Sequence, residues 1–232
     1  MCGRFALAAE IKAIAKAFGL QNMPDLPPRY NIAPSQPVAV VRASNRKERE
    51  LAIVQWGLIP SWTKDVSKWK PLINARAETA AEKPSFRTAF RRRRCLIPAS
   101  GFYEWQKVEG GKQPFFIHQQ GENDDLPLFA FAGLWERWQG ANGDELESCT
   151  ILTTTANAAM KPIHNRMPII LVPRDYDAWL LTDERDVNEL RSLLHPIDDE
   201  WVSAYPVSTT VNNPRNDVPE CLLAREVRQR PD

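Results

Sequence analysis

The chain has 232 residues and a formal net charge of +1, and its 43% hydrophobic and 25% charged residues are ordinary proportions for a globular protein with a substantial core. No run reaches the ~18 apolar residues of a membrane span, and Glu10 and Lys12 interrupt the stretch where a secretory signal would be apolar. The small net charge excludes a protein that coats duplex DNA by bulk attraction, but it permits a local basic groove. We expect a cytoplasmic protein.

The first predicted element is a helix within residues 8–18. Ile11, Ile14 and Phe18 recur there at helical spacing, and Gly19 follows as a C-cap signal. The apolar positions therefore share one face, which we expect to pack on the core.

A proline-rich loop and a hairpin follow the helix. Residues 21–37 contain too many prolines for a regular helix. Two apolar runs, at residues 37–43 and 50–56, flank a polar turn and predict paired strands. Residues 57–79 have weak periodicity, and loops of this length within a compact domain tend to be functional.

The second half of the chain is richer in strands. We predict strands at residues 94–99, 101–106, 114–119, 126–138, 146–156, 168–172 and 204–208, and short helices at 174–181 and 186–194. A Gly-Gly signal marks one hairpin, and no strand–helix–strand repeat occurs. The pattern favours an α+β fold: a single domain over residues 1–232 with a curved, barrel-like, mainly antiparallel core, and a polar tail after about residue 210.

The cysteines and histidines argue against a metal centre. The cysteines, at positions 2, 95, 149 and 221, are too widely spaced for a Cys-x-x-Cys site, and we expect reduced thiols. The histidines, at positions 118, 164 and 195, are too few for a multi-histidine site. We expect neither a metal nor a cofactor.

The chain begins MCGRF, which places a cysteine directly after the initiator methionine. Cysteine is small enough for Met1 to be removed, and Cys2 would then carry an α-amine and a thiol on adjacent carbons. Both groups are nucleophiles near neutral pH, since the amine titrates near ~7.7–8 and the thiol near ~8.5. The alternative is that Cys2 is only a small residue at an irregular chain start.

Three further polar residues stand in apolar surroundings: Asn74, Glu104 and His164. The reaction of an amine with a carbonyl group needs an oriented amine and a proton shuttle. An N-terminal nucleophile, the Asn74 amide, the Glu104 carboxylate and the His164 imidazole together would supply these parts. Each residue also has a plain structural interpretation. Asn74 would cap a helix beginning at Ala75, Glu104 would point outward from a strand, and His164 would be a loop histidine. The run of four arginines at 91–94 is typical of a solvated face.

Six motifs, in this order, closely resemble the SOS response-associated peptidase family, whose members are also called abasic site processing proteins. They are MCGRF, YNIAPSQ, WGLIPSW, LINARAET, RCLIPASGFYEW and IHNRMP. The resemblance extends from residue 2 to about residue 210. It implies a monomeric protein that binds single-stranded DNA containing an abasic site and joins the nucleoid when bound to DNA. The N-terminal cysteine would capture the ring-opened sugar aldehyde as a thiazolidine.

The resemblance also assigns roles to single residues. Cys2 matches the crosslinking nucleophile, Asn74 the residue that orients the N-terminus, Glu104 the acid/base, and His164 the histidine implicated in reversing the crosslink. Arg4 and Arg76 resemble phosphate-binding arginines, and Trp62 and Trp105 are candidates for stacking on bases. Removal of Met1 is treated in this family as self-processing, although a cellular aminopeptidase would serve. The same Schiff base permits a lyase side reaction.

Two positions depart from the family pattern. Asn165 stands where many relatives have Asp, and Lys83 or Arg87 would have to replace a further phosphate-binding arginine.

Two other function classes remain open. Glutamine amidotransferases also begin with an N-terminal cysteine, but the chain shows no ordered set of their glutamine-binding and oxyanion residues. A non-catalytic single-strand binder would keep the arginines and tryptophans without depending on Cys2.

Overall fold

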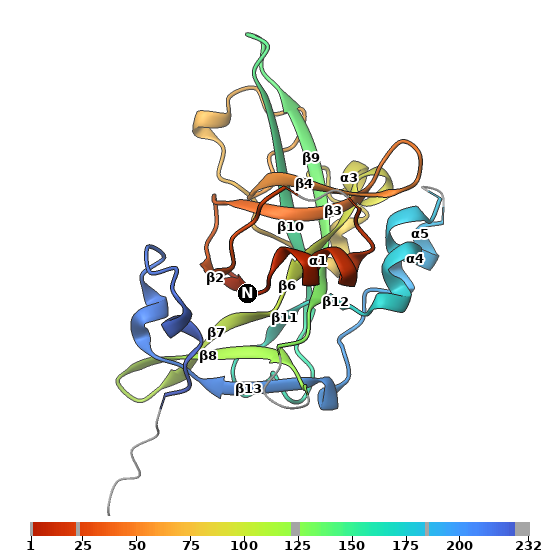
Figure 1. Ribbon diagram of the computed structural model, residues 1–232. Coiled ribbons are helices and arrows are strands. Elements are labelled where there is room, and N and C mark those ends of the chain that lie inside the picture. The colour runs from red at the N-terminus through yellow and green to blue at the C-terminus, as the bar shows by residue number, and fades with distance from the viewer. Residues whose placement is uncertain (1, 22–23, 122–125, 184–185, 226–232) are drawn as a thin grey trace, which may run out of the picture.

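Five strands close into a barrel at the centre of the molecule (Figure 1). β3 (Pro37–Ala43) pairs antiparallel with β4 (Arg49–Trp56) and β6 (Arg94–Ala99), and β6 pairs with β9 (Phe129–Gln139). β10 (Glu145–Thr155) closes the ring by pairing antiparallel with β9 and parallel with β4. The computed structural model describes residues 2–21, 24–121, 126–183 and 186–225.

A second, antiparallel sheet carries the start of the chain. Its strand order is β13 (Val202–Pro206), β8 (Gly111–Gln119), β7 (Gly101–Val108), β1 (Phe5–Leu7) and β2 (Arg29–Ile32). Phe5 is paired with both Phe102 and Ile32. Only Ser100 separates β6 from β7, so the chain passes directly from the barrel into this sheet. The first residues therefore lie beside the barrel wall.

Three short strands pair with the barrel strands β9 and β10. β5 (Asn74–Arg76) runs parallel to β10, and β11 (Arg166–Pro168) pairs antiparallel with β10. β12 (Ile170–Leu171) pairs with β9. Thr153 on β10 is opposite both Arg76 and Pro168, so two motifs far apart in the sequence flank one strand.

The described part of the chain has five α-helices: α1 (Ile11–Phe18), α2 (Ala77–Ala80), α3 (Arg87–Arg92), α4 (Tyr176–Leu181) and α5 (Val187–Ser192). In Figure 1, α4 and α5 lie on the opposite side of the view from the last turns of the chain. Among the described residues, none of these helices is long and apolar enough to cross a membrane.

Aromatic and aliphatic side chains form the core of the barrel. Trp56 is fully buried, and its indole donates to the carbonyl of Ile73 at 2.9 Å. Phe5 packs edge-on against Trp56 and Phe131, with ring centroids 5.2 and 5.7 Å apart, and so anchors β1 to the core. Gly57 has φ +133°, and a Cβ there would lie 2.5 Å from the Cβ of Pro71. Glycine is therefore required where the 57–73 loop folds back.

The prediction of an α+β fold with a barrel-like core is confirmed. The helix at 8–18 corresponds to α1, and the predicted hairpin to β3 and β4. Gly19 adopts the left-handed conformation expected of a C-cap. The later strands and both C-terminal helices also form, within a few residues of their predicted limits.

Several local predictions were wrong because tertiary pairing overrode the local signals. β1, β2 and β5 are three or four residues long and form only because β7 and β10 supply partners. Asn74 belongs to β5 and caps no helix, since α2 begins at Ala77. Of the arginines at 91–94, Arg94 is buried and donates to the carbonyls of Phe90 and Trp179 near the ends of α3 and α4.

The residues beyond 210, expected to be a polar tail, are partly packed. Short 3₁₀ helices span Thr209–Asn212 and Pro219–Leu222. Val211 and Cys221 are fully buried, in a cluster with Ala6, Tyr103 and Phe116. The tail at 226–232 lies outside the described residues.

Candidate active site around Cys2

Cys2 lies three residues before β1, and its side chain is fully buried. Its thiol Sγ is 4.0 Å from the backbone oxygen of Arg4. Burial raises the pKa of the Cys2 thiol well above its ordinary value, and the negative charge of Glu104 raises that pKa further. The thiol is therefore protonated near neutral pH.

Asn74 binds the backbone of Cys2 directly. Its side-chain amide donates to the Cys2 carbonyl oxygen at 2.8 Å. Asn74 is held by β5, whose register with β10 pairs Asn74 with Ile151. The Asn74 Oδ1 atom is buried and accepts no hydrogen bond from the described residues. It is therefore an acceptor available next to the first residues of the chain.

Glu104 points into the protein rather than outward. It lies on β7 opposite Phe115, between the buried Tyr103 and the half-buried Trp105, and only 4% of its surface is exposed. Its carboxylate is close enough to raise the pKa of the Cys2 thiol. Cys2, Asn74 and Glu104 thus come together, although they belong to the chain start, β5 and β7.

His164 is half-buried in the turn that leads into β11. Its Nδ1 accepts from the backbone N–H of Arg166 at 3.0 Å and also lies 3.1 Å from the carbonyl oxygen of the same residue, so both contacts hold the ring in the turn. The side chain of Gln106 donates to the carbonyl of Pro162 at 3.1 Å and ties this turn to β7. Gln106 and Glu104 are two residues apart, so they share one face of that strand.

Arg4 and Trp105 lie together on the same sheet. The Arg4 guanidinium stands 5.8 Å from the centre of the Trp105 ring. It donates to Asn31 Oδ1 at 2.7 Å and to the carbonyl of Val211 at 2.8 Å. Partial burial lowers the pKa of Arg4. The Trp105 indole donates to Asn212 Oδ1 at 2.8 Å.

Arg76 and Trp62 occupy exposed positions. Arg76 lies on β5, two residues after Asn74, and its charge helps to lower the pKa of Glu78, after the larger effect of the Arg166 hydrogen bonds. Trp62 is 54% exposed, and its ring packs edge-on against Trp69 at 5.3 Å. Trp62 lies on the 57–73 loop and has no hydrogen bond or ring contact to Cys2, Asn74 or Glu104 among the described residues.

The sequence interpretation missed several residues that hold this site. Arg166 forms a paired ion bridge with Glu78, at 2.5 and 3.0 Å, and donates to the carbonyl of Thr153 at 2.6 Å. Asn31 is fully buried and binds Arg4. Arg166, Glu78 and Asn31 stand inside motifs that the sequence singled out, but a motif does not tell which residue within it makes a contact.

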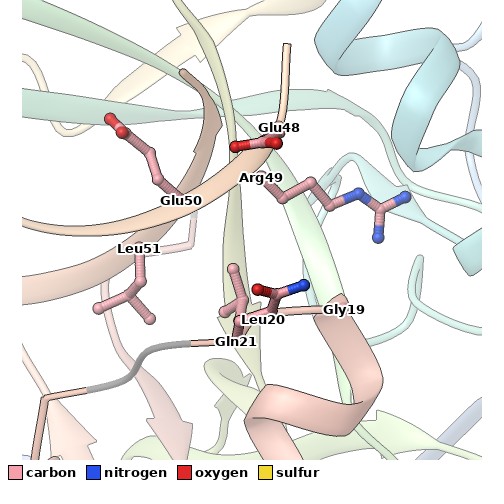
Figure 2. A pocket seen from close by; sticks show the side chains of 7 residues that line it. All are labelled: Gly19, Leu20, Gln21, Glu48, Arg49, Glu50 and Leu51. Carbon is pink, nitrogen blue, oxygen red and sulfur yellow. The ribbon is translucent and has the colours of Figure 1, made fainter. Parts of the chain in front are cut away.

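A cavity of about 510 Å³ lies elsewhere, between the end of α1 and the start of β4 (Figure 2). It is lined by Gly19, Leu20, Gln21 and residues 48–51. Arg49 in its wall is already bound to Asp177 at 2.7 Å and to the carbonyl of Phe18 at 3.1 Å. None of the predicted site residues lines this cavity, so the candidate site around Cys2 is defined by its contacts and not by a cavity. The described residues contain no group of three His, Cys, Asp or Glu suited to a metal ion.

Comparisons with known proteins show the family to which the chain belongs. The family model described as SOS response associated peptidase (SRAP) matches residues 1–214. The abasic site processing protein YoqW of Bacillus subtilis (strain 168) is 43% identical over 226 residues, covering 96% of this chain and 99% of that protein. The abasic site processing protein HMCES of Rattus norvegicus is 34% identical, covering 98% of this chain and 77% of that protein.

A solved structure shares the fold. A crystal structure of a protein from Bacteroides thetaiotaomicron superposes with a TM-score of 0.85 at 29% identity, covering 97% of this chain and all of that one. Together with the family match over nearly all of the chain, this likeness establishes that the protein belongs to the SOS response associated peptidase (SRAP) family.

Proposed function

We propose that this protein processes abasic sites by binding single-stranded DNA and joining Cys2 covalently to the opened deoxyribose. The observation that carries the proposal is the convergence of Cys2, Asn74 and Glu104 at the start of the chain. The names of the relatives, abasic site processing proteins, support the same substrate. The protein would act as a cytoplasmic monomer that meets the nucleoid through damaged DNA.

The first requirement is a free amine on Cys2. Hydrolysis of the Met1–Cys2 peptide bond consumes one water and leaves an N-terminal cysteine. Met1 itself lies outside the described residues. The new amine would be one bond from the Cys2 Cα, within reach of the buried Asn74 Oδ1, which lacks a donor among the described residues. A hydrogen bond from the amine to this oxygen would aim the nitrogen lone pair at the substrate.

The covalent reaction then has two steps. The amine nitrogen attacks C1′ of the ring-opened sugar, and the carbinolamine loses water to give an imine. The Cys2 sulfur next adds to C1′ while the thiol proton passes to nitrogen, which closes a five-membered thiazolidine. The net balance is aminothiol plus aldehyde giving thiazolidine and one water. An internal cysteine cannot react in this way because its nitrogen is an amide.

Glu104 and His164 supply the proton transfers. The thiol is protonated at neutral pH because burial and Glu104 raise its pKa, so its proton must be accepted during ring closure. The Glu104 carboxylate would accept it and return it to nitrogen. The His164 ring would donate a proton to the departing oxygen. The imine also permits β-elimination, which would make strand cleavage a side reaction.

The test uses mature protein, with removal of Met1 verified by mass spectrometry, and single-stranded DNA containing one abasic site. We expect a heat-stable adduct on denaturing gels, with the mass gain on the N-terminal peptide and no adduct from Cys2→Ala. Cys149→Ala is the matched control because it removes another fully buried thiol. It should crosslink like the parent.

Two other outcomes would replace the proposal. Glutamine hydrolysis without an adduct would indicate an N-terminal-cysteine amidotransferase. Salt-sensitive binding to single strands without any adduct, unchanged by Cys2→Ala, would indicate a non-catalytic binder.

A further inference from the structure

A segment near the C-terminus, residues 208–217, lies against β2 and Arg4, and we call it the clasp. Its main anchor is Asn31, which has no exposed surface. The Asn31 side-chain amide donates to three clasp carbonyls: Val211 at 3.2 Å, Asn213 at 3.1 Å and Asn216 at 2.7 Å. One buried amide thus fixes three points of an otherwise irregular segment.

Asp217 fastens the other end of the clasp to β2. Its carboxylate accepts the backbone N–H groups of Tyr30 at 2.5 Å and Asn31 at 2.9 Å, and it pairs with Arg29. Partial burial opposes ionisation of Asp217, but these hydrogen bonds outweigh it and lower its pKa. The clasp is therefore tied to β2 by a buried amide and by a carboxylate.

The clasp also contacts Arg4 and Trp105, two of the four residues that we predict to contact DNA. The carbonyl of Val211 and Asn31 Oδ1 accept from the same Arg4 nitrogen, at 2.8 and 2.7 Å. The side chain of Asn212 accepts from the Trp105 indole at 2.8 Å. Arg4 in turn lies over the Trp105 ring. One segment fixes a cation and an aromatic ring relative to one another.

We propose that the clasp is a substrate-positioning element. Its Val211 carbonyl, together with Asn31 of β2, orients Arg4, and its Asn212 orients Trp105, toward the phosphodiester backbone and bases beside the lesion. This inference rests on the proposed function. An arginine side chain loses rotamer entropy when it is fixed in one orientation. If the clasp fixes Arg4 and Trp105 before DNA binds, this entropy is lost when the protein folds, and DNA binding is not weakened by it.

Asn212 separates this role from a merely structural one. It is exposed, and its side chain reaches Trp105 from the surface, so the hydrogen bond adds little to the stability of the fold. Asn31 is the wrong first variant because it is buried and binds several groups, and its removal perturbs folding. Asn212→Ala frees the indole while leaving the backbone contacts of the clasp in place.

The first experiment compares Asn212→Ala with the parent on two single strands. One carries a tetrahydrofuran abasic analogue, which has no aldehyde and reports affinity, and the other carries a true abasic site. Loss of one hydrogen bond predicts an increase in Kd of about 2- to 10-fold. The half-saturating DNA concentration for adduct formation should rise equally, with the maximal rate and Tm unchanged. Asn142→Ala, at the exposed turn of the β9–β10 hairpin, should match the parent.

A double-mutant cycle tests whether Asn212 acts through the indole N–H. Trp105→Phe keeps an aromatic ring but removes the donor, so Asn212→Ala should have no further effect on Kd in that background. An equal effect of Asn212→Ala in both backgrounds, or no effect in the parent, would overturn the inference. These results are distinct from failure of the proposed function, in which the parent itself forms no adduct.

Discussion

The side-chain amide of Asn74 donates to the carbonyl oxygen of Cys2 at 2.8 Å, although 72 positions separate the two residues in the sequence. The bond fixes the peptide group that follows Cys2, and the other polar atom of the amide, Oδ1, is left as a buried acceptor. This relationship makes the position of Cys2 depend on β5 and on its pairing with β10.

Asn74→Ala should therefore slow adduct formation without weakening DNA binding. Loss of one orienting hydrogen bond predicts a rate about 2- to 10-fold lower in single-turnover gels, with an unchanged Kd for undamaged single strands. Asn74→Asp should be slow as well, because an ionised carboxylate cannot donate to the Cys2 carbonyl. A parent-like rate in Asn74→Ala would exclude the orienting role.

Glu104→Gln keeps the shape of the side chain but removes its charge and its proton-accepting group. Adduct formation should slow by about 10²- to 10⁴-fold, the usual contribution of a general acid or base. The Cys2 thiol should meanwhile become more acidic, since the Glu104 charge raises its pKa. Alkylation of Cys2 by iodoacetamide at pH 8, quantified by peptide mass spectrometry, should then be faster than in the parent. An unchanged crosslinking rate would contradict the role of Glu104 as acid or base. An unchanged alkylation rate would contradict its effect on the pKa of the Cys2 thiol.

Arg76→Ala tests the exposed cation on β5. If Arg76 contacts one phosphate, the variant should bind single strands more weakly. The slope of log Kd against log salt concentration should also fall by ~0.7, the contribution of one phosphate contact on a single strand. Lys12→Ala, an exposed cation on α1, is the control and should leave the slope unchanged. Equal slopes for the parent and Arg76→Ala would place Arg76 away from the DNA.

Asp217→Asn tests the ionic anchor of the clasp through its pH dependence. Because the folded state lowers the pKa of Asp217, its ionised form stabilises the protein above the ordinary aspartate pKa of about 3.9. Near neutral pH, we expect the free energy of unfolding of the variant to be about 1–2 kcal/mol lower than that of the parent. That difference should shrink as the pH falls through the lowered pKa. Urea unfolding of both proteins from pH 7 to pH 3 measures it, and a difference that grows toward acid would refute the anchor.

The chemistry-bearing residues were accessible from the sequence because they stand inside motifs. Cys2 behind Met1, Asn74 in LINAR and Glu104 in GFYEW were predicted as site residues, and the structure brings these three together. Periodicity located α1 and the β3–β4 hairpin for a similar reason, since local patterns of apolar residues suffice for long, regular elements.

The supporting residues could not be found in this way. Asn31 lies in the four-residue strand β2 and Asp217 in an irregular stretch, and their roles arise from contacts across more than 180 positions. The expected polar tail became the clasp because Val211 and Cys221 find a buried cluster that only the folded sheet provides.

By itself, then, the sequence determined the candidate reactive groups and the α+β character of the fold. An aminothiol, an amide and a carboxylate are properties of single residues, and alternation or helical spacing is a property of neighbours. The tertiary structure alone decided where those groups meet. β5 has only three residues and no independent stability, so Asn74 reaches Cys2 only once β10 has formed beside it.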